Sequence, residues 1–218
     1  MNLVADSFAW PFRGAWRSKW AAGVFAVLFL PLLFIVVLGY AIAATRAAEI
    51  DPAQGPPAWR LSGRLITEGT WTTLAVLLVA APFIVAFNPF ANALYVAHVW
   101  RSADAGLSLF YARVLALLIL ALPLGIALLL VMPNAAASFA ASGRPRDLFD
   151  FAAALRGVRR DFATWNLAAA AIVTGWAVGV ACVGLLCVGL VPGIFYAILV
   201  SAHASAALHD KGSPSPAR

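Results

Sequence analysis

Four long stretches of the sequence contain no aspartate, glutamate, lysine or arginine, and they restrict the fold more than any other feature. They are Trp20–Thr45, Gly69–Trp100, Val114–Gly143 and Phe162–His209. A helix of about 20 apolar residues crosses the hydrocarbon core of a bilayer, which is about 30 Å thick. Each of the first three stretches is long enough for one span, and the fourth is long enough for two spans and a turn. The sequence therefore predicts a polytopic membrane protein.

The composition supports this prediction. Hydrophobic residues make up 63% of the 218 residues and charged residues 11%, whereas soluble domains average about 45–50% apolar and about 25% charged residues. A soluble chain of this length could not keep so much apolar surface away from water. The net charge of +6 comes without the zinc-ligand spacings or basic runs of nucleic-acid readers. We therefore expect no nucleic-acid partner, and we expect the arginines to face loops and anionic lipid headgroups.

We predict an all-α, polytopic transmembrane helical bundle that forms a single domain over residues 21–209. The expected spans are residues 21–44, 71–97, 107–132, 164–186 and 190–209. A turn within Gly184–Gly193 separates the last two spans, because Pro192 cannot continue a helical hydrogen-bond ladder undisturbed. Residues 210–218 are expected to form a disordered polar tail.

The second span has two interpretations. Pro82 and the Asn88-Pro89 pair interrupt it. We favour a single kinked span, which gives five spans, and the alternative is a re-entrant pair of half-helices, which leaves four. Half-helices of this kind line substrate sites in transporters. Asn88 is therefore a candidate pathway residue, together with Asn92 and Asn134.

Two amphipathic segments are predicted to lie along the membrane surface. In residues 1–20, aromatic residues recur every four positions from Phe8 to Trp20, and in residues 146–161 apolar residues recur every three or four positions. Such helices place aromatic side chains and arginines at the level of the headgroups. The predicted interface residues are Trp10, Phe12, Arg13, Trp16, Arg17, Trp20, Arg156, Arg159 and Arg160.

The positive-inside rule gives an orientation. With five spans, the loop from Arg46 to Glu68, residues 133–161 and the C-terminal tail share one side, which carries ten lysines and arginines against four on the other. We therefore expect residues 133–161 and the C-terminus to be cytoplasmic. The side of the N-terminus stays open, because the three cations of residues 1–20 equal the three in the loop from Arg46 to Glu68.

The predicted spans carry almost no titratable chemistry. They lack carboxylates and lysines, so the sequence indicates no proton relay, sodium site or acid–base pair. It also lacks zinc-protease, Ser/His/Asp and phosphate-loop motifs, and we expect no metal, no cofactor and no enzymatic activity. His98 and His203 are possible ligands for haem or a pigment, but the favoured interpretation is a histidine hydrogen-bonded to a neighbouring helix. Cys182 and Cys187 point to different sides of a helix and are interpreted as small apolar filler.

Small residues at a spacing of four mark a helix-packing surface. Such rows let two helix backbones approach closely. We favour packing within the chain, and the alternative is an interface with a second copy or another protein. The residues are Ala171, Gly175, Gly179, Gly189 and Gly193.

Several short motifs carry a family resemblance. They are Trp10-Pro11-Phe12-Arg13, Gly39-Tyr40 at the end of the first apolar run, Arg46, Gly55-Pro56-Pro57-Ala58-Trp59, Glu68-Gly69 and Ala202-His203. In this order they resemble the domain of unknown function 4013 family, small prokaryotic multi-helix membrane proteins. The resemblance implies a multi-pass protein of the prokaryotic inner or plasma membrane and supplies no activity. The chain departs from the family pattern after His203, where it has Ala204-Ser205-Ala206-Ala207 in place of a Gly-Gln pair.

Our functional expectation is a non-enzymatic scaffold or accessory subunit of a membrane complex. Its partners would be the lipid bilayer and other membrane proteins or a second copy of the chain, and the sequence identifies no small-molecule substrate. The alternative is a small transporter or channel component with a broken second span.

Overall fold

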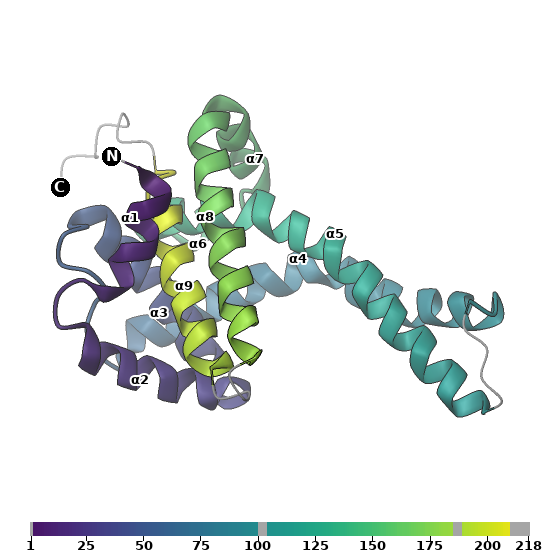
Figure 1. Ribbon diagram of the computed structural model, residues 1–218. Helices are drawn as coiled ribbons and strands as arrows, with labels where there is room; N and C mark the ends of the chain where they lie inside the picture. The colour runs from purple at the N-terminus through teal and green to yellow at the C-terminus, as the bar shows by residue number, and fades with distance from the viewer. Residues whose placement is uncertain (1, 100–103, 185–188, 210–218) are drawn as a thin grey trace. The chain divides into compact units, whose positions relative to one another are not determined.

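The computed structural model in Figure 1 describes residues 2–99, 104–184 and 189–209. Within these ranges every regular element is helical, which confirms the predicted all-α fold class. The predicted tail at 210–218, the last residues of the span 164–186 and Cys187 lie outside the described residues. The elements are α1 (Leu3–Ala9), η1 (Trp10–Phe12), α2 (Trp16–Leu28), α3 (Leu30–Ile50), α4 (Gly63–Val96), α5 (Ala105–Ser142), α6 (Pro145–Phe149), α7 (Phe151–Arg160), α8 (Phe162–Ala181), η2 (Cys182–Gly184) and α9 (Leu190–Ala206).

Four of the described helices are long and apolar enough to cross a membrane. They are α3, α4, α5 and α8, and α9 is a shorter apolar helix of 17 residues. The chain divides into two compact units. Unit 1 comprises Met1–Thr73 and Leu130–Arg218, and unit 2 comprises Leu74–Leu129.

The core of unit 1 forms around α9, which packs against α1, α2, α3 and α8 (Figure 1). Phe195 and Leu199 of α9 are fully buried, and they share one apolar cluster with Trp10, Tyr40 and Ala44. The ring of Trp20 meets Phe195 edge-on at 5.7 Å between ring centroids. Aromatic pairs in such tilted arrangements add about 0.5–1.5 kcal/mol beyond the burial of their surface. The segments before and after the long helices therefore build this core together with the spans.

The N-terminal segment corrects our prediction of a surface helix. Instead of one helix, the chain forms α1, the 3-10 turn η1 and the start of α2, because Pro11 lacks an N–H group and Gly14 adopts a left-handed backbone with φ of 63°. The side chain of Trp10 is 0% exposed and belongs to the core. A fully buried indole cannot lie among headgroups, so Trp10 is a core residue. Phe12 and Arg17 remain exposed.

The first predicted span, residues 21–44, is also divided. Helix α2 ends at Leu28 and α3 begins at Leu30, with Pro31 in its first turn, a position where the missing N–H of proline costs no hydrogen bond. Helix α3 then continues to Ile50 and includes Arg46. The predicted loop from Arg46 to Glu68 is therefore shorter, since helix α4 already begins at Gly63.

Helix α4 corrects the re-entrant interpretation of the second span. It runs as one helix from Gly63 to Val96 with Pro82 and Pro89 inside it. Each proline removes a single backbone hydrogen bond, and the long apolar helix continues through both. The alternative of a broken second span is therefore wrong.

Unit 2 consists of the later part of α4 and the earlier part of α5. Its buried side chains include Ala80, Ala91, Ala112 and Ala116, whereas leucines and isoleucines such as Leu122 are exposed. In both helices only 11% of the most apolar 18-residue window is buried. The apolar surface of unit 2 is thus turned outward, as in a segment surrounded by lipid.

The predicted amphipathic segment at 146–161 forms two helices, α6 and α7. Asp150 separates them and caps α7, because its carboxylate accepts a hydrogen bond of 2.8 Å from the backbone N–H of Ala153. In α7 the side chains of Ala154 and Val158 are buried. The arginines of this helix are exposed: Arg156, Arg159 and Arg160.

Candidate functional site

One group of polar and charged residues of unit 1 lies where α3 ends, α4 begins and α5 and α9 end. We call this region the polar end; it comprises Arg46, Glu49, Arg64, Glu68, Asn134, Arg160, Asp161 and His209. It brings together the segments that the charge pattern of the sequence assigns to one side of the membrane. Two features stand out within it, a buried ion-pair network and a small pocket.

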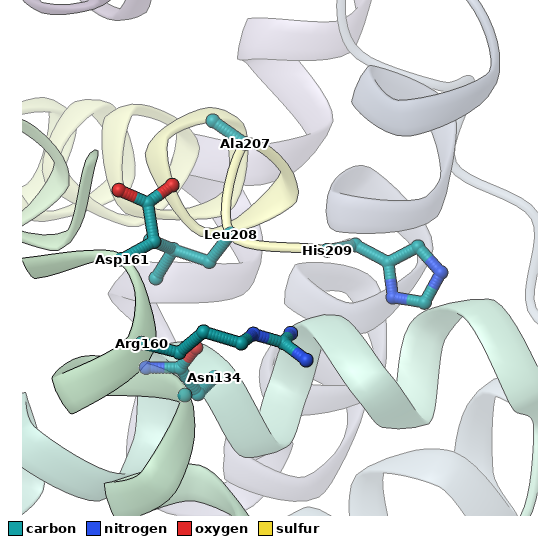
Figure 2. A pocket seen from close by; sticks show the side chains of 7 residues that line it. Asn134, Arg160, Asp161, Ala207, Leu208 and His209 are labelled. Carbon is teal, nitrogen blue, oxygen red and sulfur yellow. The ribbon is translucent and has the colours of Figure 1, made fainter. Parts of the chain in front are cut away.

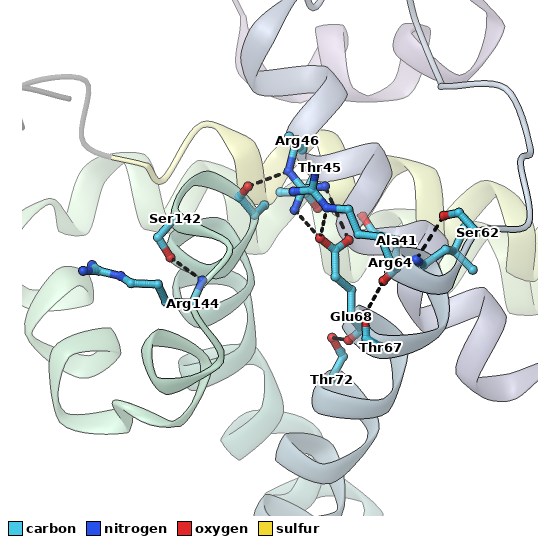
Figure 3. A network of polar contacts seen from close by, with 12 residues as sticks. Ala41, Thr45, Arg46, Ser62, Arg64, Thr67, Glu68, Thr72, Ser142 and Arg144 are labelled. Carbon is cyan, nitrogen blue, oxygen red and sulfur yellow. Dashed lines mark hydrogen bonds and ion pairs between the residues drawn. The ribbon is translucent and has the colours of Figure 1, made fainter. Parts of the chain in front are cut away.

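The ion-pair network centres on Glu68 (Figure 3). The guanidinium of Arg46 donates to the Glu68 carboxylate at 2.8 Å and 3.4 Å, and its Nε donates to the backbone carbonyl of Ala140 at 2.7 Å. Arg64 donates to the same carboxylate at 2.7 Å. The side chain of Glu68 is 8% exposed, whereas that of Arg64 is 65% exposed. The network therefore joins α3, α4 and the end of α5 through one buried carboxylate.

A close helix crossing lies beside this network. A side-chain carbon added at Gly39 of α3 would collide with the backbone carbonyl of Leu65, and one added at Gly69 of α4 would collide with that of Ile35. Glycine thus allows the two backbones to approach directly. Our packing row of small residues did not include this pair, although both glycines belong to the family motifs.

The motif residues of the central loop also meet in the core. The hydroxyl of Tyr40 donates to the carbonyl of Pro57 at 3.0 Å. The ring of Tyr40 stacks on Trp59 at 3.9 Å between centroids with an interplanar angle of 7°. Residues after α3 therefore fold back onto α3, and the motifs that carry the family resemblance define one packed core.

The pocket of the polar end has a volume of about 200 Å³. Figure 2 shows Asn134 of α5 and Arg160 of α7 side by side, with His209 opposite them. The pocket is lined by Asn134, Gly157, Arg160, Asp161, Ala207, Leu208 and His209. Of these, Arg160 was predicted as an interface residue and Asn134 as a pathway residue, but no sequence signal joined them.

The two acidic residues near the pocket have defined roles. The side chain and backbone of Thr164 donate hydrogen bonds that hold the pKa of Asp161 below its usual value, and its carboxylate accepts the Thr164 N–H at 3.1 Å as the N-cap of α8. Glu49 of α3 lies 3.5 Å from the Nε2 of His209. Asp161 therefore stays ionised, and His209 is tied to α3.

His203 lies in the core and is one of our candidate ligand residues. Its Nδ1 is 2.9 Å from the Oγ of Ser7, and the Ser7 hydroxyl donates to the carbonyl of Leu3 at 2.9 Å. The Ser7 hydroxyl thus lies between the Leu3 carbonyl and His203, and the tautomer of the imidazole sets which group donates in the His203–Ser7 bond. The imidazole also lies against Trp10 at 5.4 Å between ring centroids. This geometry agrees with the interpretation of a histidine that packs one helix on another.

The other candidate ligand or pathway residues lie apart from His203. Asn88 is exposed on α4 in unit 2, and His98 is exposed in the turn after α4 with φ of 51°. Among the described residues, no group of three His, Cys, Asp or Glu side chains could hold a metal ion.

The predicted packing row forms the contact between α8 and α9. A side-chain carbon at Gly179 would come within 2.5 Å of the carbonyl of Gly193, and one at Gly175 within 2.9 Å of Val200. Ala171 is buried, and Gly189 immediately precedes α9. The row therefore packs two helices of the same chain.

The close contact between α8 and α9 can be tested by making the same glycine-to-alanine substitution at two positions, one inside the contact and one outside it. Gly193→Ala is expected to lower the free energy of unfolding by about 1–3 kcal/mol, because the new methyl group meets the backbone of Gly179. Gly125→Ala is expected to be neutral or to raise it by about 0.5–1 kcal/mol, since nothing lies within 4 Å of the new methyl group. Denaturant-induced unfolding in detergent micelles measures both changes, and equal effects would contradict the close contact.

Comparison with known proteins supplies a family and no activity. The family model described as "Protein of unknown function (DUF4013)" matches residues 23–200. No curated protein and no solved structure matches the chain.

Proposed function

The chain belongs to the DUF4013 family of proteins of unknown function, and from this premise we propose that it is a non-enzymatic scaffold or accessory subunit of a membrane complex. The observation that carries the proposal is the surface of unit 2. Its two helices expose leucine and isoleucine side chains along their length while burying mainly alanines. This surface suits lipid and the apolar helices of a membrane partner.

The polar end supports a structural role for unit 1. Its buried carboxylate is paired with Arg46 and Arg64, and the buried imidazole is paired with Ser7. A group that is fixed by such partners serves packing more readily than acid–base chemistry. These pairings support the non-enzymatic part of the proposal.

The transporter alternative has lost its main support, because α4 is continuous. Its remaining candidates are exposed Asn88 and Asn92 in unit 2 and buried Asn134 in unit 1. The scaffold proposal is therefore preferred.

We place the protein in a prokaryotic plasma membrane with residues 133–161 and the C-terminus in the cytoplasm. The polar end supports this topology, because it brings Arg46, Arg64 and Arg160 into one region, in agreement with the positive-inside rule for a cytoplasmic face. Bilayer lipid and other membrane proteins are the proposed partners, and nucleic acid is not.

The proposal predicts that one face of α5 holds a protein partner. Leu118, Leu122 and Ile126 recur every four positions and are exposed, so they share a helix face. Replacing all three by alanine keeps the face apolar for lipid but removes the bulk that a partner helix would pack against. We expect recovery of a stoichiometric partner in mild-detergent pull-down to fall at least about tenfold, with membrane insertion unchanged.

The matched control is the triple alanine variant of Leu28, Leu32 and Ile35, which are exposed in unit 1. This variant should retain the partner. Absence of a stoichiometric partner from the unmodified protein, or equal losses in both variants, would contradict the proposal. Solute flux in proteoliposomes that depends on Asn88 would favour the transporter instead.

A further inference from the structure

The N-terminal segment is attached to the part of the chain that follows α3. The guanidinium of Arg13 donates to the carbonyl of Pro52, two residues beyond the end of α3, at 3.1 Å. A side-chain carbon added at Gly14 would lie 2.5 Å from the carbonyl oxygen of Gln54. Because α3 ends at the polar end, α2 begins on the same side of unit 1. Helices α2 and α3 pack against each other and therefore form a hairpin that leaves this side and returns to it.

The contact of α1 with α9 agrees with this placement. Ser7 lies 2.9 Å from the imidazole of His203, which is three residues before the end of α9. Figure 1 shows α1 beside the later part of α9. The residues that follow α9 belong to the polar end. The N-terminal segment and the polar end thus lie on one side of unit 1, a question that the charge count of the sequence left open.

A cluster of aromatic rings lies where α2 begins. Phe12 stacks on Trp20 at 5.3 Å between ring centroids and meets Trp16 edge-on at 5.7 Å. Tyr196 of α9 lies 5.8 Å from Phe12. Phe12 is 48% exposed, and the rings of Trp16 and Trp20 are half-buried. We call Phe12, Trp16, Trp20 and Tyr196 the aromatic cluster. Tryptophan and tyrosine are enriched where a membrane meets water, because their rings suit the level of the headgroups.

Two cations beside the aromatic cluster have no acidic partner. The exposed guanidinium of Arg17 lies 5.6 Å from the centre of the Trp16 ring, and Lys19 follows two positions later. Neither forms an ion pair within the described parts of the chain, whereas Arg13 is paired with Asp6 at 3.0 Å. The next 26 residues carry no charge. The two cations therefore mark the boundary of the apolar region.

We propose that Arg17, Lys19 and the aromatic cluster form a binding surface for anionic phospholipid headgroups, in the same leaflet as the polar end. The two cations donate to phosphate oxygens, and the exposed rings lie between the headgroups and the acyl chains. An acidic protein would match the charges alone, whereas a lipid also matches the apolar helix that follows them. The inference rests on the membrane location proposed above and needs no protein partner at unit 2.

The first test measures which lipid lies beside the two cations. Ser18, which is exposed between them, is replaced in a full chain carrying Cys182→Ala and Cys187→Ala. The Ser18→Cys thiol is labelled with bimane, and the protein is placed in nanodiscs of phosphatidylcholine with a minor fraction of phosphatidylglycerol. The quencher is a doxyl group near the headgroup of either lipid. Each cation at an anionic surface contributes a factor of about five, so we expect phosphatidylglycerol to be enriched about fivefold or more.

A matched pair of charge variants separates this surface from general attraction. Arg17→Gln combined with Lys19→Gln should lower the enrichment to less than about twofold. Arg144→Gln combined with Arg146→Gln removes the same charge from two exposed arginines that are paired with Asp147, and it should retain most of the enrichment. Thermal unfolding followed by tryptophan fluorescence verifies that both variants fold.

The second test determines the leaflet. Ser18→Cys and Ser142→Cys, which is exposed at the end of α5, are treated with a membrane-impermeant maleimide in intact cells and in inside-out vesicles. We expect both thiols to react in the vesicles and neither in the cells. Reaction of both in intact cells alone would support the common leaflet and contradict the cytoplasmic orientation proposed above.

Four results would overturn the inference. Equal quenching by the two lipids would indicate an aromatic surface that does not recognise headgroups, and quenching by neither would indicate that a protein covers the surface. Reaction of the two thiols from opposite sides would exclude a common leaflet. Equal losses of enrichment in the two charge variants would exclude the two cations as the site. Enrichment of phosphatidylglycerol without a partner in the pull-down would support the lipid surface and contradict the scaffold.

Discussion

Glu68→Gln is expected to lower the free energy of unfolding by about 3–5 kcal/mol, the effect of leaving a buried charge without its counterion. The substitution keeps the size of the side chain but removes its charge. The Arg46 side chain, which is 19% exposed, is left with the carbonyl of Ala140 and a neutral amide oxygen as its acceptors. Denaturant-induced unfolding in detergent micelles measures the loss. Because Arg46, Glu68 and Ala140 come from three helices, we also expect looser packing of α3 on α4.

Two further variants test the physical cause. Arg64→Gln should cost less than about 1 kcal/mol, because the Arg64 side chain is 65% exposed and exposed ion pairs contribute little. The double variant Arg46→Met with Glu68→Leu removes both charges and should recover much of the stability lost in Glu68→Gln. A Glu68→Gln protein as stable as the unmodified one would contradict a buried, structural ion pair.

Trp10→Ala is expected to lower the free energy of unfolding by about 3–5 kcal/mol, the range for large aromatic residues truncated in cores. The indole is 0% exposed and lies against His203 in the apolar cluster of unit 1. Its removal would leave a cavity between η1 and α9. The same unfolding experiment measures the effect.

Trp10→Phe and Trp16→Ala are the controls for this substitution. Phenylalanine retains most of the ring and removes the indole N–H, which has no hydrogen-bond partner among the described residues, so its cost should be well below that of alanine. Trp16 is half-buried and contacts Phe12 and Trp20 edge-on, so Trp16→Ala should cost only about 1 kcal/mol. If Trp10→Ala and Trp16→Ala lowered the free energy of unfolding by similar amounts, the N-terminal segment would be a surface segment.

The helical class of the chain and its apolar helices could be predicted because they depend on local properties. A stretch without charged residues can be recognised as a span from its own sequence, without knowing what packs against it. The packing row was visible for the same reason, since Gly175 and Gly179 are neighbours on one helix face.

The position of Trp10 could not be predicted in this way. Aromatic residues that recur every four positions are expected both in a helix that lies on a membrane surface and in a helix that packs on a protein core. The difference depends on α9, whose Tyr196 hydroxyl donates to the Phe8 carbonyl at 3.2 Å from 188 positions away.

The ion-pair network and the pocket of the polar end could not be predicted from the sequence for a similar reason. Arg46 and Glu68 are separated by 22 positions and lay in a segment predicted to be irregular, and Asn134 and Arg160 belong to different helices. Only the i,i+4 spacing of Arg64 and Glu68 was a local signal, and it also occurs on ordinary solvent-exposed helices.

The contact between Ser7 and His203 affects how the protein is made. These residues lie 196 positions apart, so α1 cannot make this contact until α9 has been synthesised. Local helices such as α4 form early, whereas contacts of such sequence separation form late. A chain interrupted before α9 would expose Trp10 and the faces of α2 and α3 that α9 covers. An unfinished copy would therefore differ from the finished protein in the exposure of its N-terminal segment.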